Sequence, residues 1–304
     1  MRILVVGAGA VAVGGYFGGR LLEKGEDVTF LVRKGRKEQI LGSGLEIESV
    51  HGDVDLHPSI ITKEEQAEPF DVILLSTKAY HLEAVMEDLL PFASNDTMIL
   101  PLLNGMAHME KLDQAFGATN VLGGLCFIES TLDASGKVVQ TSPIHDLVFG
   151  ERNGERTERI EELEKAFSGT KANFRLSSTI EQEMWHKYLF ISTMSGVTSL
   201  FRSPIGPIRE SEEGLKVMND VLYNISAIMR NLNAPIKDQV EISLLDKMHQ
   251  MDYRMKSSMQ RDMEKGHPVE AEHFYGYLLE AAESHSIDSP LLSAIHGNLM
   301  VYSS

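Results

Sequence analysis

A short glycine-containing segment near the start of the 304-residue chain has the composition of a phosphate-binding turn. Gly7-Ala8-Gly9-Ala10 directly follows a strand-like apolar run, Ile3 to Val6, and precedes a helical pattern that begins at about Val13. In that position Gly7 permits a tight turn, Gly9 lets the backbone approach a pyrophosphate, and the helix terminus supplies N–H groups and partial positive charge. The segment predicts dinucleotide binding, against the simpler alternative that its glycines only join a strand to a helix.

A cluster of cations follows the second predicted strand, Asp27 to Val32. Arg33, Lys34 and Arg36 lie there, and residues 33–36 contain no Asp or Glu. In a dinucleotide-binding fold this strand ends near the adenosine ribose, where an NAD-preferring site places an acid to accept from the 2′-OH. Cations without an acid favour a 2′-phosphate, so the sequence predicts NADPH as the cofactor. The alternative is a solvated basic loop.

Lys187 lies in a predicted helix, 181–200, among bulky and largely apolar neighbours. A lysine in such surroundings can lose its water and have its pKa lowered, which makes it a proton donor at a useful pH. Hydride addition to a ketone develops negative charge on the oxygen and needs a donor or cation of this kind. The alternative is a lysine on the exposed stripe of an amphipathic helix.

Four other polar residues are candidates for holding a substrate. Glu270 opens a predicted helix, where the helix dipole favours a carboxylate whether or not it accepts from a substrate hydroxyl. Ser258 and Asp262 are four residues apart and so share a helix face; the serine can donate to a carboxylate, and the aspartate is suited to orienting neighbours. Asn104 follows a predicted parallel strand, where ligands of open α/β sheets bind, although Asn-Gly by itself favours a turn.

Strand-like and helix-like segments alternate through the first half of the chain. The expected strands are 3–6, 27–32, 70–76, 97–103 and 172–176, with a hairpin over 45–61 and a β extension over 121–150, and the expected helices are 13–23, 81–92 and 155–167. This alternation predicts parallel βαβ units with right-handed crossovers. After Ser178 the pattern is helical, over 181–200, 212–232, 237–249, 269–284 and 290–301. The loops between these helices include 203–207.

The predicted fold class is therefore α/β, with an N-terminal Rossmann-type doubly wound sheet followed by an all-α C-terminal domain. We place the boundary near residues 177 and 178. Residues 1–177 would form the NADP-binding domain, and residues 178–304 the helical domain that carries the substrate and catalytic groups.

Composition limits the classes of partner. The formal net charge of -16 argues against general nucleic-acid binding. The single cysteine, Cys126, excludes an intramolecular disulfide and suits a reducing compartment, the cytoplasm. No apolar run is long enough to span a bilayer, and the histidines lack metal-ligand spacing, so neither a membrane nor a metal is expected. The long C-terminal helices could pair two subunits in a homodimer.

The order of these short motifs resembles the ketopantoate reductase family (2-dehydropantoate 2-reductases) over nearly the whole chain. The matching pieces in the first half are Gly7-Ala8-Gly9, Arg33, Ser76-Thr77-Lys78-Ala79 and Asn104-Gly105-Met106. Those in the second half are Trp185-His186-Lys187, Ser257-Ser258-Met259-Gln260-Arg261-Asp262 and Pro268-Val269-Glu270. Each piece is short, but their order and separations are specific.

The resemblance implies the reduction of 2-dehydropantoate to pantoate with NADPH, a step of pantothenate biosynthesis. By the resemblance Lys187 is the general acid. The second catalytic residue, Glu270, holds the substrate together with Ser258. Asn104 and Lys78 line the cleft between cofactor and substrate.

The chain departs from the family pattern in part of the substrate shell. The helix after Lys187 should carry asparagines that contact pantoate, and Ile191 and Ser195 stand at those positions. Ile205 stands where a further asparagine is expected. Ser195 keeps a hydroxyl and stays a candidate substrate ligand. Ala12-Val13 is an apparent two-residue insertion before the first helix.

These departures keep two other functions open. One is a related NADP-dependent hydroxy-acid or opine-type dehydrogenase that acts on a different 2-keto acid. The other is a non-catalytic NADP(H) sensor that has kept only the cofactor site. The presence of both Lys187 and Glu270 argues against the sensor, because only catalysis needs a lysine beside the nicotinamide.

Overall fold

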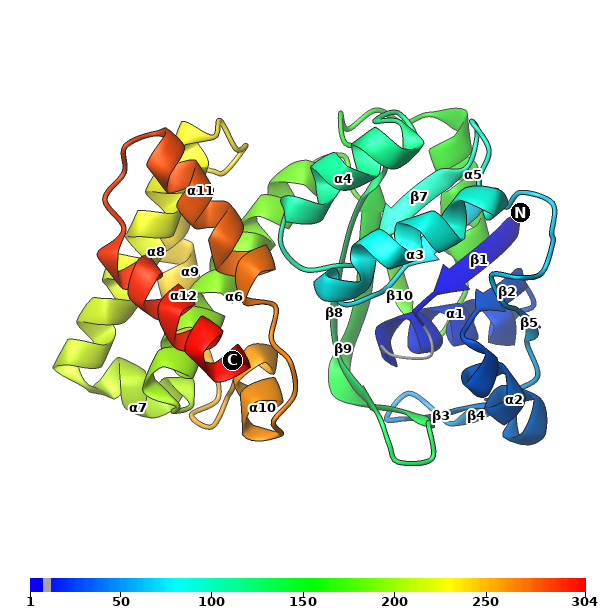
Figure 1. Ribbon diagram of the computed structural model, residues 1–304, viewed down its shortest axis with the longest axis horizontal. Coiled ribbons are helices and arrows are strands. Elements are labelled where there is room, and N and C mark those ends of the chain that lie inside the picture. Colours follow the sequence, from blue (N-terminus) through cyan, green and yellow to red (C-terminus); the bar gives the residue numbers. More distant parts are fainter. Residues whose placement is uncertain (8–11) are drawn as a thin grey trace. The chain divides into compact units, whose positions relative to one another are not determined.

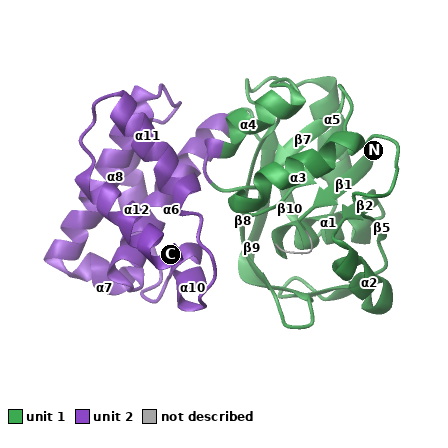
Figure 2. Ribbon diagram, viewed as in Figure 1, with its two compact units in different colours: residues 1–104, 108–180 green, residues 105–107, 181–304 purple. Residues whose placement is uncertain are grey.

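The computed structural model describes residues 1–7 and 12–304. Contacts divide the chain into two compact units, residues 1–104 with 108–180 and residues 105–107 with 181–304 (Figure 2). The described strands all belong to the first unit, and the second unit is helical (Figure 1). Among the described residues, no helix is both long and apolar enough to cross a membrane. The mixed α/β architecture with a helical C-terminal region is the fold class that the sequence predicts.

Five parallel strands form the first sheet, in the order β5-β2-β1-β6-β7. They are β1 (Arg2–Val6), β2 (Asp27–Leu31), β5 (Ser59–Ile61), β6 (Val72–Leu75) and β7 (Met98–Pro101). β6 and β7 are fully buried apolar runs, as expected for parallel strands that are covered on both faces. The chain reverses its direction of travel across the sheet between β1 and β6. The carboxyl ends of these two strands therefore form the switch point at which open α/β sheets bind ligands.

The second sheet has the order β10-β9-β3-β4, with β8 paired to β9. Its strands are β3 (Leu45–Ser49), β4 (Val54–Leu56), β8 (Gly123–Leu132), β9 (Val138–Gly150) and β10 (Asn173–Leu176). The predicted hairpin is confirmed as the antiparallel pair β3 and β4, and the predicted β extension is the hairpin β8–β9. The prediction was wrong for residues 59–61, because these pair in parallel with the buried apolar end of β2 and complete the first sheet.

Helix α1 (Ala12–Lys24) packs closely on both sheets through glycines. A β-carbon on Gly18 would lie 2.7 Å from a methyl group of Val5 in the first sheet, and one on Gly19 would overlap the Ile47 side chain in the second. The apparent insertion Ala12-Val13 forms the first turn of this helix. Glycine thus recurs in α1 because larger residues would push the sheets away.

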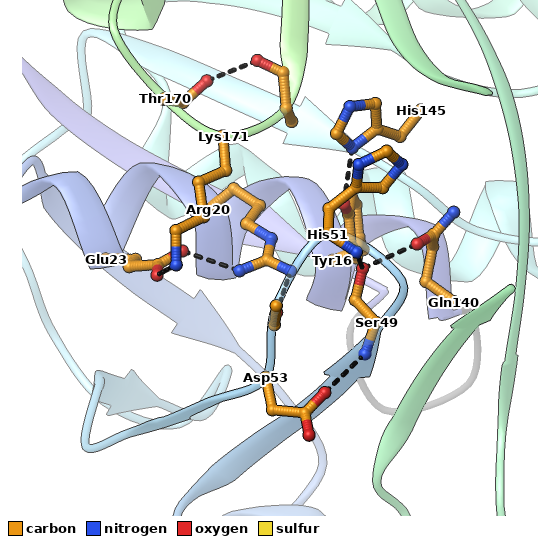
Figure 3. A network of polar contacts seen from close by, with 12 residues as sticks. Tyr16, Arg20, Glu23, Ser49, His51, Asp53, Gln140, His145, Thr170 and Lys171 are labelled. Atoms are coloured by element: carbon orange, nitrogen blue, oxygen red, sulfur yellow. Dashed lines mark hydrogen bonds and ion pairs between the residues drawn. The ribbon is translucent and has the colours of Figure 1, made fainter. Parts of the chain in front are cut away.

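A polar network joins α1 to the second sheet (Figure 3). The fully buried Arg20 donates to the carbonyl of Gly52 at 2.6 Å, and its guanidinium lies over the Tyr16 ring. The Tyr16 hydroxyl shares a hydrogen bond of 2.7 Å with Nδ1 of His145, whose ring stacks on that of His51 with 3.6 Å between centroids. Burial, and then the nearby His51 and Arg20, lower the pKa of His145. The network therefore favours a neutral His145 in the folded protein.

Besides α1, the described part of the first unit contains the α-helices α2 (Lys34–Ser43), α3 (Leu82–Leu89), α4 (Ala107–Phe116) and α5 (Glu158–Phe167). The sequence patterns predicted α3 and α5 but neither α2 nor α4. In α2 only Ile40 is buried, so the helix lacks the periodic apolar stripe that marks an amphipathic helix.

The second unit consists of α6 (Ile180–Phe201), α7 (Ile205–Glu210), α8 (Glu212–Asn231), α9 (Val240–Gln250), α10 (Ser258–Glu264), a π-helical turn (Glu272–Gly276), α11 (Tyr277–Ser284) and α12 (Pro290–Ser303). Two details differ from the prediction. Helix α7 begins within the predicted loop 203–207, and the predicted helix 269–284 contains the π-helical turn. This turn is important for the candidate site.

Candidate active site

The chain turns sharply at Gly7, directly after β1. Gly7 has a φ of 102°, a backbone conformation that favours glycine. A β-carbon there would overlap the carbonyl of Ser76, which follows β6. The Ser76 N–H donates to the Val6 carbonyl at 3.0 Å, so the two strand ends are held together at the switch point. The other predicted members of the phosphate-binding segment, Ala8, Gly9 and Ala10, lie outside the described residues.

The cations after β2 lie at the start of a helix and not in a loop. Arg33 takes the N-cap position of α2 with an extended backbone, and the first turn of α2 contains no acidic residue. Arg33 and Lys34 are both exposed. The positive end of the helix dipole adds to their charge, so this end of α2 attracts anions.

Arg36, the third cation of the predicted cluster, has a different environment. Its guanidinium donates to the carbonyl of Gly136, in the turn between β8 and β9, at 2.7 Å and to the side-chain oxygen of Gln39 at 2.7 Å. Burial lowers the pKa of Arg36. Arg36 thus connects α2 to the second sheet, which leaves Arg33 and Lys34 as the exposed cations of the cluster.

Two further predicted residues follow β6 and β7, the neighbours of β1 in the sheet. Lys78 is half-buried at the N-cap position of a 3₁₀ turn, Ala79–His81. Asn104 is half-buried in the bend after β7, and Gly105 beside it has a φ of 81°. That geometry fits the plain Asn-Gly turn, and it also places Asn104 where α/β sheets bind ligands. Gly7, Lys78 and Asn104 therefore follow the carboxyl ends of three adjacent strands.

Lys187 lies in α6 and is only 9% exposed. Its neighbours Trp185, Tyr188 and Leu189 are also buried, so Lys187 is not on an exposed helix stripe. His186 has a separate role, because its Nε2 accepts from the backbone N–H of Lys237 at 3.0 Å. Lys187 is therefore a cation largely shielded from bulk water, and a lysine in such a setting can act as a proton donor.

The residues at the expected asparagine positions are more apolar than the family pattern. Ser195 is buried in α6, and Ile191 is half-buried one helical turn before it. Ile205 is completely buried at the start of α7, where its backbone N–H donates to the Met255 carbonyl at 3.0 Å. Ile205 is therefore a core residue, and Ser195 is the only one of the three with a polar side chain.

Ser258 and Asp262 lie one turn apart in α10, as their spacing predicts. Ser258 is exposed and Asp262 is half-buried, with its carboxylate 3.9 Å from Nδ1 of His267. The adjacent Ser257 caps the helix, since its Oγ accepts from the Gln260 N–H at 3.1 Å. Oγ of Ser257 also shares a 2.8 Å hydrogen bond with the Thr198 hydroxyl, which connects α10 to α6.

Glu270 is half-buried at the start of the last helical segment before α12. Its carbonyl accepts from the Phe274 N–H at 3.0 Å, so Glu270 begins the first turn, where the helix dipole favours a carboxylate. The chain then forms the π-helical turn Glu272–Gly276. Such turns occur mostly as single insertions in α-helices and frequently at functional sites.

Two tyrosines connect α6 to this turn. The Tyr188 hydroxyl donates to the Phe274 carbonyl at 2.5 Å, and the Tyr275 hydroxyl donates to the Ser192 carbonyl at 2.8 Å. Both side chains are completely buried, and burial raises the pKa of both hydroxyls well above the usual range. Both therefore stay protonated and act as donors. The sequence alone does not single out this pair, because a single tyrosine in an apolar helix is also typical of an ordinary core.

Both halves of the chain match models of one protein family. The family model described as Ketopantoate reductase PanE/ApbA matches residues 3–154, and the model of its C-terminal part matches residues 179–303. The chain is 47% identical over 302 residues to the uncharacterized oxidoreductase YkpB of Bacillus subtilis (strain 168), with 99% of each chain covered.

Two solved structures are similar over nearly the whole chain. One is the 2-dehydropantoate 2-reductase of Geobacter metallireducens GS-15, with 28% identity, a TM-score of 0.87 and 99% of each chain covered. The other is D-mandelate dehydrogenase with NADH and anilino(oxo)acetate, which shares the fold at 19% identity and a TM-score of 0.87, covering 100% of this chain and 98% of that one. Both family models and the B. subtilis relative lead to one conclusion: the chain is an oxidoreductase that belongs to the ketopantoate reductase (PanE/ApbA) family.

Proposed function

We propose that the protein reduces 2-dehydropantoate to pantoate with NADPH, the reaction that supplies pantoate for pantothenate biosynthesis. The observation that carries the proposal is the burial of Lys187 at the position of the family's general acid. Reduction of a 2-keto acid places negative charge on the ketone oxygen, so the oxygen must receive a proton. A buried ammonium can donate that proton more effectively than water can.

Residues of the first unit fit the cofactor. Gly7 packs against the Ser76 carbonyl so closely that no side chain fits there, and a glycine turn of this kind after the first strand is where dinucleotide-binding folds hold the pyrophosphate. We assign Gly7 to Ala10 to the pyrophosphate and Arg33 to the 2′-phosphate. Lys78 and Asn104 are assigned to the part of the cofactor nearer the substrate. Bound NADPH supplies the hydride.

Residues of the second unit are assigned to the substrate. Lys187 donates a proton from Nζ to the ketone oxygen and then recovers one from solvent. Glu270 accepts a hydrogen bond from the terminal hydroxyl of the substrate, and Ser258 donates one to its carboxylate. Ser195 adds a further hydrogen bond, as does Asn104 of the first unit, and Asp262 orients its neighbours. Each polar group of 2-dehydropantoate thus has a partner of suitable chemistry.

A second candidate is the reduction of a less polar 2-keto acid by the same residues. The observation that favours it is the apolar character of Ile191 and Ile205, since these side chains replace hydrogen-bonding groups. The fold also occurs in an enzyme named for mandelate, another 2-hydroxy acid. A non-catalytic NADP(H) sensor fits less well, because it would have no need for a buried lysine.

The loss of NADPH absorbance during incubation with a panel of 2-keto acids distinguishes these functions. We expect 2-dehydropantoate to give the highest kcat/KM in the panel. A clear preference for another 2-keto acid would support the second candidate. Tight NADPH binding without oxidation of the cofactor by any member would support the sensor.

We further propose that the protein acts in the cytoplasm as a homodimer. The single cysteine, Cys126, is buried in β8 and is not part of a disulfide, which suits a reducing compartment. The helical unit exposes large apolar side chains, including Ile242, Met300 and Val301, which a second copy of the chain could cover. Light scattering of the purified protein tests the dimer, and a monomeric mass at working concentration would contradict it.

A further inference from the structure

Two reciprocal hydrogen bonds fix the π-helical turn against α6. Tyr188 of α6 donates to a carbonyl of the turn, at Phe274, and Tyr275 of the turn donates to a carbonyl of α6, at Ser192. On α6 the two anchor points are four residues apart and so lie one above the other on one face. On the turn they are adjacent. Two bonds at different heights oppose both sliding and rotation of the turn relative to α6.

Each bond lies close in the chain to a group assigned to catalysis. Lys187 directly precedes Tyr188. Glu270 lies one turn before Phe274, and its carbonyl accepts from the Phe274 N–H. The rotational setting of the turn therefore determines where the Glu270 side chain points relative to α6.

A π-helical turn contains one residue more than an α-helical turn. If the turn relaxed to α-helix, the preceding residues would rotate by about 100° around the helix axis, the angle between successive residues. Glu270 would then point to a different side of the helix. A fixed π-helical turn thus holds Glu270 in one of two possible rotational positions around the helix axis.

A third contact restrains the same turn within the second unit. A β-carbon on Gly105 would lie 3.0 Å from Nε2 of His273, the residue before Phe274. The His273 ring therefore occupies the space beside Gly105, and only glycine fits there without displacing it.

We propose that Tyr188 and Tyr275 are positioning residues, which hold the π-helical turn against α6 and so set Glu270 relative to Lys187. The inference rests on the proposed function, because Lys187 and Glu270 are taken as its catalytic pair. The two hydroxyls are buried too deeply to be replaced by bulk water, so their removal leaves the turn without these anchors.

The variants Tyr188→Phe and Tyr275→Phe remove each hydroxyl and keep each ring. We expect each to lower kcat by about ten- to a hundredfold, because small displacements of catalytic groups have effects of this size. The dissociation constant of NADPH should stay unchanged. Tyr223→Phe is the matched control, since Tyr223 in α8 is 51% exposed, and its kcat should equal that of the wild type.

A double-mutant cycle with Glu270→Gln separates positioning from general stability. If the tyrosines act through Glu270, either Tyr→Phe change should lower kcat by less than about threefold in the Glu270→Gln background. The full loss in that background would overturn the proposal. Unchanged kcat in both single variants, with a lowered Tm, would overturn it as well, because the hydroxyls would then serve stability alone.

Amide hydrogen exchange provides a readout that does not depend on turnover. Faster exchange of residues 270–279 in Tyr188→Phe than in the wild type supports the positioning role, and unchanged exchange there overturns it. If the wild type reduces no 2-keto acid, the proposed function fails, and the exchange result still decides whether the tyrosines hold the turn.

Discussion

Arg33 allows a direct test of the cofactor assignment. It lies exposed at the N-cap of α2, where Lys34 and the helix dipole add positive charge. A charge-assisted hydrogen bond contributes about 1.5–3 kcal/mol. Because Arg33 is open to solvent, we expect the lower value, about 1.5 kcal/mol, which is roughly tenfold in affinity. Arg33→Ala should therefore raise KM for NADPH about tenfold and leave KM for NADH within about twofold.

The assay is the initial rate at a saturating concentration of the 2-keto acid, with each cofactor varied in turn. Arg36→Ala is the matched control, because it removes the same charge from a guanidinium that already bonds to Gly136. This control should leave the ratio of the two KM values unchanged and lower the free energy of unfolding by about 1–2 kcal/mol. An equal rise of KM for both cofactors in Arg33→Ala would refute the reasoning. A selective loss of NADPH binding in Arg36→Ala would refute it too.

Three other predictions follow from the structure. Lys187→Ala should lower kcat by about 10²–10⁴-fold with an unchanged NADPH titration by fluorescence, and more than about a tenth of the wild-type rate would contradict this. Gly7→Ala should lower the free energy of unfolding, measured in urea, by more than Gly25→Ala does. Both glycines have φ above 100°, but of the two only Gly7 lies against a carbonyl, that of Ser76, so equal losses would contradict this steric clash. His145→Gln should weaken the fall in stability that begins as the pH decreases below about 6.5, and an unchanged fall would contradict a role for His145.

Stability should fall with decreasing pH because the folded and unfolded states bind different numbers of protons at His145. The pKa of His145 is lowered in the folded protein, by burial first, from its ordinary value of 6.5. Between the two values the unfolded chain binds more protons than the folded protein. The stability that His145 contributes is therefore complete above about pH 6.5 and is lost as the pH falls through the lowered pKa. His186 adds to the same trend, because burial and then Lys237 lower its pKa.

The sequence predicted the parallel sheet well, because its central strands are short apolar runs that periodicity and composition both identify. It also predicted the helical character of the second half. Helix α2 was missed for a physical reason. Its residues include three cations and only one buried side chain, Ile40, so a helix and a basic loop have nearly the same pattern. Its helical start changes the interpretation of Arg33 from a loop residue to an N-cap residue.

The π-helical turn could not be predicted from the sequence. Residues 269–284 carry an apolar pattern close to the helical period, and one extra residue in a single turn changes that pattern very little. The turn depends on tertiary hydrogen bonds from Tyr188 and to Ser192, which lie about 80 residues earlier in the chain. Ile205 presents a similar case, since only the packing shows that it belongs to the core.

The central claim is that the protein recognises 2-dehydropantoate, with Glu270 accepting from its terminal hydroxyl. The most direct test compares kcat/KM for 2-dehydropantoate with that for an analogue that lacks this hydroxyl, in the wild type and in Glu270→Ala. We predict that the wild type prefers 2-dehydropantoate by about ten- to a hundredfold, the worth of one hydrogen bond to a charged group, and that Glu270→Ala erases the preference. Equal kcat/KM for both compounds in the wild type would contradict the claim, because the enzyme would then be a reductase of a plainer 2-keto acid.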